Sequence, residues 1–302
     1  MKNLYKRLDV FSCFHESHRG FKNKISVYHI LKEKACYPNG CFYFRWRCKQ
    51  LSRQKKCYRG FSQVGRKCFS CKDFYEEKIH NYPELQISEA EYRDFLRELD
   101  RFEDWIRETE YHEIEIAGVV DAVKPHFKKK IFPKANYLSF RGYIVIFKEI
   151  FLDRVHFKDY VYLRLSGNYF NNQPLGRLDK IEARARLKVE QGRLVLYRPK
   201  AIQIVSRGEK PLWDEQAILL ARESATEFSS QPEGCVQCPF GALVDVEYLK
   251  DHHSHSSRQL LCLKGVKDYK DCYVPAEYCG LDREANATPD AACESNRKIY
   301  HL

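Results

Sequence analysis

Long apolar runs are missing from this sequence. The longest, Tyr143 to Phe147, has the length of a strand and falls far short of the roughly 20 residues of a membrane-spanning helix. The first ten residues also lack the apolar centre of a secretion signal. We therefore expect a cytoplasmic protein with no membrane partner.

Motifs that mark common catalytic sites are missing as well. The chain contains no G-x-x-x-x-G-K-[ST] phosphate loop, no H-E-x-x-H zinc helix and no G-x-S-x-G nucleophile elbow. A few carboxylates are enough for a metal-dependent nuclease, so the absence of these motifs leaves enzyme activity undecided. It favours a binding protein without a catalytic residue.

Cysteine is abundant but unevenly placed. Of the 13 cysteines, seven lie between Cys13 and Cys71, six lie between Cys235 and Cys293, and the long stretch between these groups has none. An odd number leaves at least one thiol outside any closed set of disulfides. In a reducing cytosol, grouped cysteines are more often metal ligands than bridges.

Charge is segregated in the same way, and together the two patterns divide the chain into four segments. Residues 1–87 hold 19 basic and 7 acidic residues, and 88–110 hold 4 and 9. Residues 111–210 hold 20 and 10, and 211–302 hold 9 and 15. We predict a basic Cys-rich metal-binding segment, an acidic helix, a basic β domain and an acidic Cys-rich metal-binding segment with a disordered tail.

The acidic segment predicts one amphipathic helix, from about 89 to 109. Ser88 and Glu91 form a capping box, in which each side chain bonds a backbone N–H of the first turn. The apolar residues then recur at helical spacing on one face. They are Tyr92, Phe95, Leu96, Leu99, Phe102 and Ile106.

From about 112 onward the apolar period changes to two, which is typical of β-strands. Ile181 to Val189 alternates apolar with charged residues, and Gln191-Gly192 predicts a hairpin turn after it. The pattern predicts five strands in all. They are 112–123, 143–152, 160–165, 181–189 and 193–198, the last with an extension to 205.

These strands, the lysine-rich stretch after the first of them and the closing hairpin resemble the OB-fold over residues 111–207. The resemblance implies a central five-stranded barrel that binds oligonucleotides or oligosaccharides through its second and third strands and its loops. With the helix and the two Cys-rich segments, the predicted fold class is α+β, mainly β.

Single-stranded nucleic acid needs aromatic rings for its bases and cations for its phosphates. Outward positions of the third and fourth predicted strands carry both kinds of side chain, and basic stretches near 128 and 45 add cations. The candidate contacts are Tyr160, Tyr162, Arg164, Arg184, Arg186, Lys188, Lys128, Lys129, Lys130, Arg45 and Arg47. Equally, the two tyrosines could pack in a core.

Two C-x2-C pairs mark the candidate metal sites, because this spacing lets one tight turn present two thiolates to a metal. Cys68 and Cys71 are completed by Cys48 and Cys57, or equally by Cys36 and Cys41. The C-terminal ligands expected on the same grounds are Cys235, Cys238, Cys262 and Cys272, with Cys279 as a substitute. Zinc in two sites is favoured, and a 4Fe-4S cluster is the alternative.

The sequence therefore predicts a non-catalytic protein that binds single-stranded nucleic acid and is stabilised by Cys-ligated metal. The alternative is an iron–sulfur protein of nucleic-acid or redox metabolism. A protein partner on the acidic 211–302 segment is also expected from its charge. DNA and RNA stay equally open, as do the pathway and the oligomeric state.

Overall fold

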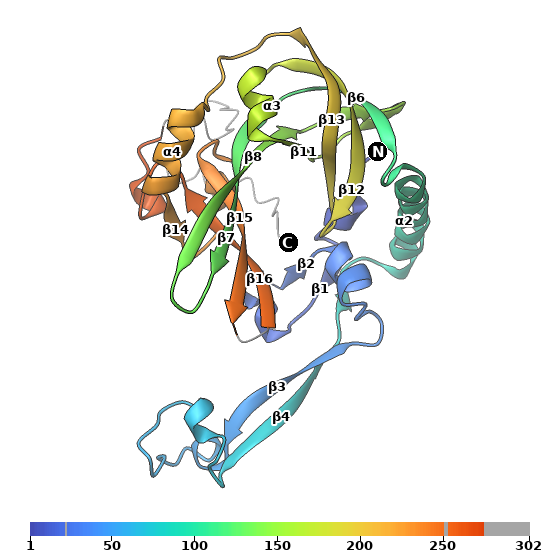
Figure 1. Cartoon of the computed structure of the whole chain (residues 1–302). Coiled ribbons are helices and arrows are strands. Elements are labelled where there is room, and N and C mark those ends of the chain that lie inside the picture. Colours follow the sequence, from blue (N-terminus) through green and yellow to red (C-terminus); the bar gives the residue numbers. More distant parts are fainter. Residues whose placement is uncertain (22, 251–252, 275–302) are drawn as a thin grey trace, which may run out of the picture. The chain divides into compact units, whose positions relative to one another are not determined.

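The protein has two compact units (Figure 1). A computed structural model describes residues 1–21, 23–250 and 253–274. Of the described residues, one unit is formed by Tyr5–Phe95, and the other by Met1–Leu4 together with the residues from Leu96 to 274. Among the described residues, no helix is both long and apolar enough to span a membrane.

The larger unit is built on one mixed sheet of eleven strands. In hydrogen-bonded order these are β10 (Val155–Phe157), β9 (Ile150–Leu152), β6 (Glu113–Val119), β12 (Lys180–Glu190), β13 (Arg193–Ser206), β11 (Val161–Leu165), β8 (Asn136–Phe147), β7 (Ala122–Ile131), β15 (Gly241–Lys250), β16 (His253–Cys262) and β14 (Thr226–Phe228). The β11–β13 and β7–β15 pairs are parallel, and the other pairs are antiparallel.

Alternating side chains give this sheet its core. Along β12, Ile181, Ala185 and Leu187 are fully buried, whereas Glu182 and Arg184 are exposed. The side chains of a strand point to opposite faces in turn, so one face of β12 packs inward and the other meets solvent. The predicted hairpin joins β12 to β13, with both turn residues at positive φ.

The predicted closed five-stranded barrel is wrong. The predicted strand 112–123 is divided between β6 and β7, and the predicted strand 143–152 between β8 and β9, whereas the other three are present as β11, β12 and β13. Strand β9 adds to the free side of β6, and β15 adds to the free side of β7. The stretch expected to be a lysine-rich loop is strand β7, because acidic strand β15 beside it supplies partners for its lysines. Lys128 pairs with Glu247 at 3.0 Å.

The described part of the C-terminal segment does not form a separate unit. Its strands β15, β16 and β14 complete the large sheet, and Val244 and Val246 are fully buried there. Helices α4 (Glu215–Ser224) and α5 (Glu233–Gln237) and the short turn Tyr269–Asp271 are connected to these strands. Between β11 and β12, helix α3 (Gly167–Asn172) is capped by Ser166.

The smaller unit combines a three-stranded sheet with a long hairpin. Strands β2 (Lys24–Ile25), β1 (Phe11–Ser12) and β5 (Glu84–Leu85) form the sheet. Strands β3 (Cys41–Cys48) and β4 (Phe74–Asn81) form the hairpin. Short helical turns link these strands: Leu4–Lys6, Glu16–Phe21, His29–Glu33, Lys49–Ser52 (α1) and Arg66–Cys68.

The predicted amphipathic helix is confirmed as α2 (Glu89–Thr109). The capping box forms: the backbone N–H of Ser88 donates to Glu91 at 2.9 Å, and the N–H of Glu91 donates to the Ser88 hydroxyl at 3.3 Å. Phe95, Leu99 and Phe102 lie on the buried face. The local spacing of apolar residues was sufficient to place this element.

Candidate nucleic-acid interface

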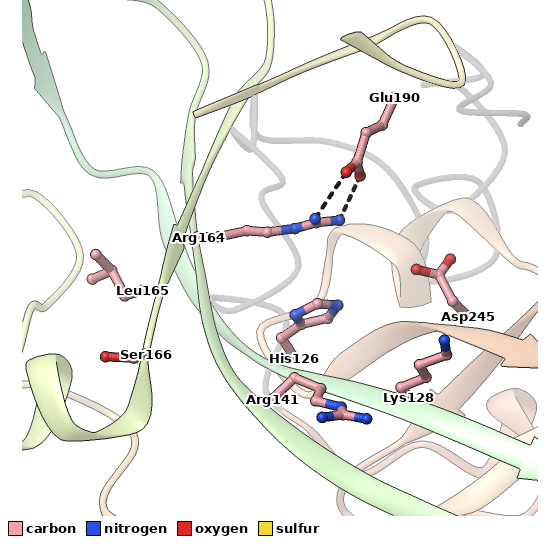
Figure 2. Close-up of a pocket in the computed structure, with 8 residues that line it drawn as sticks. All are labelled: His126, Lys128, Arg141, Arg164, Leu165, Ser166, Glu190 and Asp245. Atoms are coloured by element: carbon pink, nitrogen blue, oxygen red, sulfur yellow. Dashed lines mark hydrogen bonds and ion pairs between the residues drawn. The ribbon is translucent and has the colours of Figure 1, made fainter. Parts of the chain in front are cut away.

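A pocket of about 580 Å³, lined mostly by charged and polar residues, lies on the large sheet (Figure 2). Two of the predicted contacts, Lys128 and Arg164, line it. The complete lining is His126 and Lys128 from β7, Arg141 from β8, Arg164 and Leu165 from β11, Ser166 before α3, Glu190 from β12 and Asp245 from β15. Strands that are far apart in the sequence thus supply one site.

A bulge in the β7–β8 pair positions Arg141. His126 pairs with Gly142 and Phe127 pairs with Phe140, so Arg141 is the extra residue between them. Gly142 has φ +116°, and a Cβ added there would lie 2.1 Å from the Leu165 carbonyl oxygen. Glycine is therefore required for β8 to approach β11, and the bulge directs the Arg141 side chain into the pocket.

Glu190 holds two of the cations at the pocket. Its carboxylate accepts two hydrogen bonds from the Arg164 guanidinium, at 2.9 and 2.5 Å, and a further contact at 2.5 Å from the Lys188 ammonium. The other pocket acid, Asp245, pairs with Arg258 at 2.9 Å. Arg141, in contrast, is exposed and has no hydrogen bond or ion pair within the described part of the chain.

His126 and Arg193 are half-buried basic residues of this region. Burial, together with the smaller effect of the nearby Arg164 and Arg193 charges, lowers the pKa of His126 to about 4, so the ring is neutral at pH 7. Burial also lowers the pKa of Arg193, although Glu190 and Asp245 oppose this effect. The Arg193 Nε is buried without a hydrogen-bond partner.

The predicted tyrosines do not form an open stacking platform. Tyr162 lies under the Arg193 guanidinium, which is 5.6 Å from the centre of its ring, and burial raises the pKa of its hydroxyl. Tyr160 is half-buried beside Asp159, whose carboxylate accepts a hydrogen bond from the Tyr160 backbone N–H. Both predicted tyrosines are therefore half-buried.

Most of the other predicted cations lie elsewhere and have acidic neighbours. Arg184 pairs with Glu113 across β12 and β6, and Arg186 lies opposite Glu113 in the same register. Lys129 is buried and pairs with Glu227, whereas half-buried Lys130 faces Glu247 in the register. In the smaller unit, Arg45 pairs with Glu16 and Arg47 with Glu77.

Sequence reasoning missed His126, Arg141, Glu190 and Arg193. A glycine within an apolar strand pattern often marks a bulge or a close backbone approach, so Gly142 was the available signal for Arg141. Glu190 and Arg193 are register partners across the predicted Gln191-Gly192 turn, so the hairpin was the available signal for this pair. His126 reaches them only through the pairing of distant strands.

The candidate metal ligands are spread over several environments. Cys48 ends β3, and Cys57, Cys68 and Cys71 lie between β3 and β4, where the Tyr58 hydroxyl is 3.4 Å from the Cys71 sulfur. In the larger unit, Cys238 and Cys262 are buried, Cys235 is half-buried and Cys272 is exposed. Within the described ranges, no three His, Cys, Asp or Glu side chains are grouped as a metal site.

The substitute ligand Cys279 lies outside the described residues. Comparison of the chain with protein-family models, curated proteins and solved structures found no match. The resemblance of residues 111–207 to the OB-fold stays a prediction, and the pocket must be interpreted from its own chemistry.

Proposed function

We propose that this protein binds single-stranded nucleic acid through the pocket of the large sheet, without catalysing a reaction. The observation that carries the proposal is Arg141, a cation that a β-bulge directs into a pocket and that has no acidic partner among the described residues. A phosphate group would give this guanidinium two charge-assisted hydrogen bonds.

The charges around the pocket support an anionic ligand. Glu190 is shared by Arg164 and Lys188, so one carboxylate faces two cations. Lys128 and Asp245 already have partners of opposite charge, Glu247 and Arg258. Arg141 and the half-buried Arg193 therefore add positive charge that the neighbouring acids do not balance.

A single strand fits this site better than a duplex. The pocket lies on a β-sheet and is lined by polar side chains of five strands, whereas duplex readers usually insert a helix or a two-stranded ribbon into a groove. An unpaired strand can turn its phosphates toward Arg141 and Arg164 and place a base over the polar lining. DNA and RNA would both satisfy these contacts.

The test is a titration of the full chain with a fluorescein-labelled oligonucleotide of mixed sequence, as single strand and as duplex, at two salt concentrations. Arg141→Ala should weaken single-strand binding about tenfold and reduce the salt dependence by about one phosphate contact. Arg154→Ala is the matched control, since Arg154 is an exposed arginine in the β9–β10 turn, away from the pocket lining.

If Arg141→Ala and Arg154→Ala weaken single-strand binding equally, the pocket is not the binding site. If the wild-type chain shows no salt-dependent binding to any single strand, the proposed function itself is wrong. Preference for the duplex would also contradict it.

A further inference from the structure

The hairpin β3–β4 carries a row of exposed aromatic rings. Phe42, Phe44 and Trp46 alternate along β3, and their side chains are 53, 54 and 40% exposed. Residues two apart in a strand point to the same face, so the three rings lie on one side of the hairpin. Phe69, which is 51% exposed, extends the row, with its ring centre 4.8 Å from that of Trp46.

These rings are not the packing core of the hairpin. The opposite face holds Tyr43, Arg45 and Arg47, which are half-buried and contact one another or acidic residues. Single exposed rings are common on protein surfaces, but a continuous row of large apolar side chains marks an interaction surface. We therefore treat the row as an interaction surface.

The positive charge of the hairpin favours an anionic ligand for this row. Residues 41–81 hold eleven lysines and arginines against three acidic residues. On the aromatic face, Lys78 lies opposite Phe44 in the register, and its Nζ is 4.1 Å from the centre of the Phe42 ring. The segment between the strands adds further exposed cations: Lys49, Arg53, Lys55, Lys56, Arg66, Lys67 and Lys72.

We infer that this face, formed by Phe42, Phe44, Trp46, Phe69 and Lys78, stacks the unpaired bases of a single-stranded nucleic acid. Bases offer π-faces to aromatic rings, and their phosphates match the cations of the hairpin and of the segment at its end. A purely apolar partner would leave this excess of positive charge unbalanced.

The inference extends the proposed function to a second contact surface and rests on the same ligand class. It also differs from the sequence-based hypothesis for this segment, which placed the binding on Arg45 and Arg47. Those two arginines lie on the other face and have acidic partners. The aromatic row supplies what the pocket of the larger unit lacks, because Tyr162 in that unit is covered.

The experiment uses the full chain, a fluorescein-labelled poly(dT) 20-mer and a poly(U) 20-mer, with fluorescence anisotropy as the measurement. Phe44→Ala should raise the Kd about tenfold, because one stacked base is lost, while the salt dependence stays unchanged. Phe44→Tyr should bind like the wild type. Phe44→Leu keeps the apolar area but loses the π-face, and should behave like Phe44→Ala.

Tyr75→Ala is the matched control. Tyr75 is 36% exposed and pairs with Arg47, which places it on the opposite face of the same hairpin. The Tyr75→Ala substitution should leave the Kd within a factor of two of the wild-type value. The thermal unfolding midpoint of each variant confirms that the chain is folded, and Trp46→Ala provides a second ring substitution if Phe44→Ala fails to fold.

Failure of this inference and failure of the proposed function give different results. If Arg141→Ala weakens binding but Phe44→Ala and Trp46→Ala do not, the pocket stands and the aromatic face is excluded. If Phe44→Leu binds like the wild type, the π-face of Phe44 does not stack a base and the inference is wrong. If the wild-type chain binds neither oligonucleotide, both proposals fall.

Discussion

The neutral His126 ring links the pocket to the stability of the large sheet. Its pKa is lowered to about 4 by burial and by the surrounding arginines, against an ordinary value of 6.5. An unfolded chain takes up a proton at this histidine near pH 6.5, whereas the folded chain resists it until about pH 4. The folded state therefore binds fewer protons than the unfolded state between these two values.

We predict that this difference makes the protein less stable as the pH falls. The contribution of His126 is fully present above pH 6.5 and is lost progressively toward pH 4, which corresponds to about 2 kcal/mol of unfolding free energy between pH 7.5 and pH 5. His126→Gln should remove this part of the pH dependence. Urea unfolding of both proteins at the two pH values measures it.

His156→Gln is the control for this prediction. His156 lies in β10 with its side chain 37% exposed and its ring 3.3 Å from Glu149. This substitution should leave the loss of stability between pH 7.5 and pH 5 close to that of the wild type. An unchanged pH dependence in His126→Gln would show that the histidine is not the group responsible.

At the scale of single elements, the segment between β3 and β4 has the turns expected of a metal site. The Gly60 N–H donates to the Cys57 carbonyl oxygen at 2.9 Å, and the Cys71 N–H donates to that of Cys68 at 2.9 Å. Tight turns of this kind let thiolates converge on one ion. Zinc at Cys48, Cys57, Cys68 and Cys71 stays a prediction, as does its iron–sulfur alternative.

We expect purified protein to carry zinc, and the double variant Cys68→Ser/Cys71→Ser to carry one equivalent less. Metal analysis of the two proteins measures this, and Cys36→Ser/Cys41→Ser tests the other ligand set. The C-terminal site is tested in the same way with Cys235→Ser/Cys238→Ser. Visible absorbance of anaerobically purified protein, with iron in place of zinc, would favour the 4Fe-4S cluster instead.

Elements with a strong local pattern were predictable from the sequence. Helix α2 follows from the capping box of Ser88 and Glu91, and the β12–β13 hairpin follows from strict alternation and Gln191-Gly192. Strand β7 was missed because Lys128, Lys129 and Lys130 break the apolar alternation. Their acidic neighbours Glu247 and Glu227 lie more than 90 residues away in the sequence and become partners only in the folded sheet.

The same limit applies to the candidate site. Lys128 was predicted as a cation of a lysine-rich loop and Arg164 as a cation at an outward strand position, and both line the pocket. Their immediate surroundings depend on strand pairing over long distances and on one bulge, neither of which has a short-range signal apart from Gly142. The exposure of Phe42, Phe44 and Trp46 was also undecidable, because aromatic rings alternate in packed and open strands alike.

At the scale of the whole molecule, the segregated charges have a structural explanation. Part of the acidic surplus after residue 210 pairs with the basic residues of β7 along strands β15 and β14, as Glu247 and Glu227 show. These acids are thus used within the fold. A protein partner on the acidic segment stays a proposal, and it would have to contact other residues.

Because β15 belongs to the large sheet, we predict that damage to it destabilises the entire larger unit. Val246→Asp places a charge at a fully buried position and should cost at least about 3 kcal/mol of unfolding free energy. Val119→Asp, at a valine that is 46% exposed in β6, is the control and should cost less than about 1 kcal/mol.

Denaturant unfolding followed by near-ultraviolet circular dichroism checks this prediction. Trp213 is buried and donates a hydrogen bond from its indole N–H to the Val123 carbonyl oxygen at 3.0 Å, so its signal reports on the sheet. The unfolding transition of the Val246→Asp variant should move to lower denaturant concentration and stay a single step. A separate early step that leaves the Trp213 signal intact would mean that the C-terminal strands unfold on their own.

The division of the chain into two units has a consequence for the order of folding. Met1–Leu4 belong to the larger unit, and Asn3 donates a hydrogen bond to the Gly192 carbonyl oxygen over 189 residues of sequence. The smaller unit is complete once residue 95 has left the ribosome, whereas the larger one must wait for β15 and β16. Contacts over such separations form slowly, so during synthesis the first residues of the chain are among the last to form their native contacts.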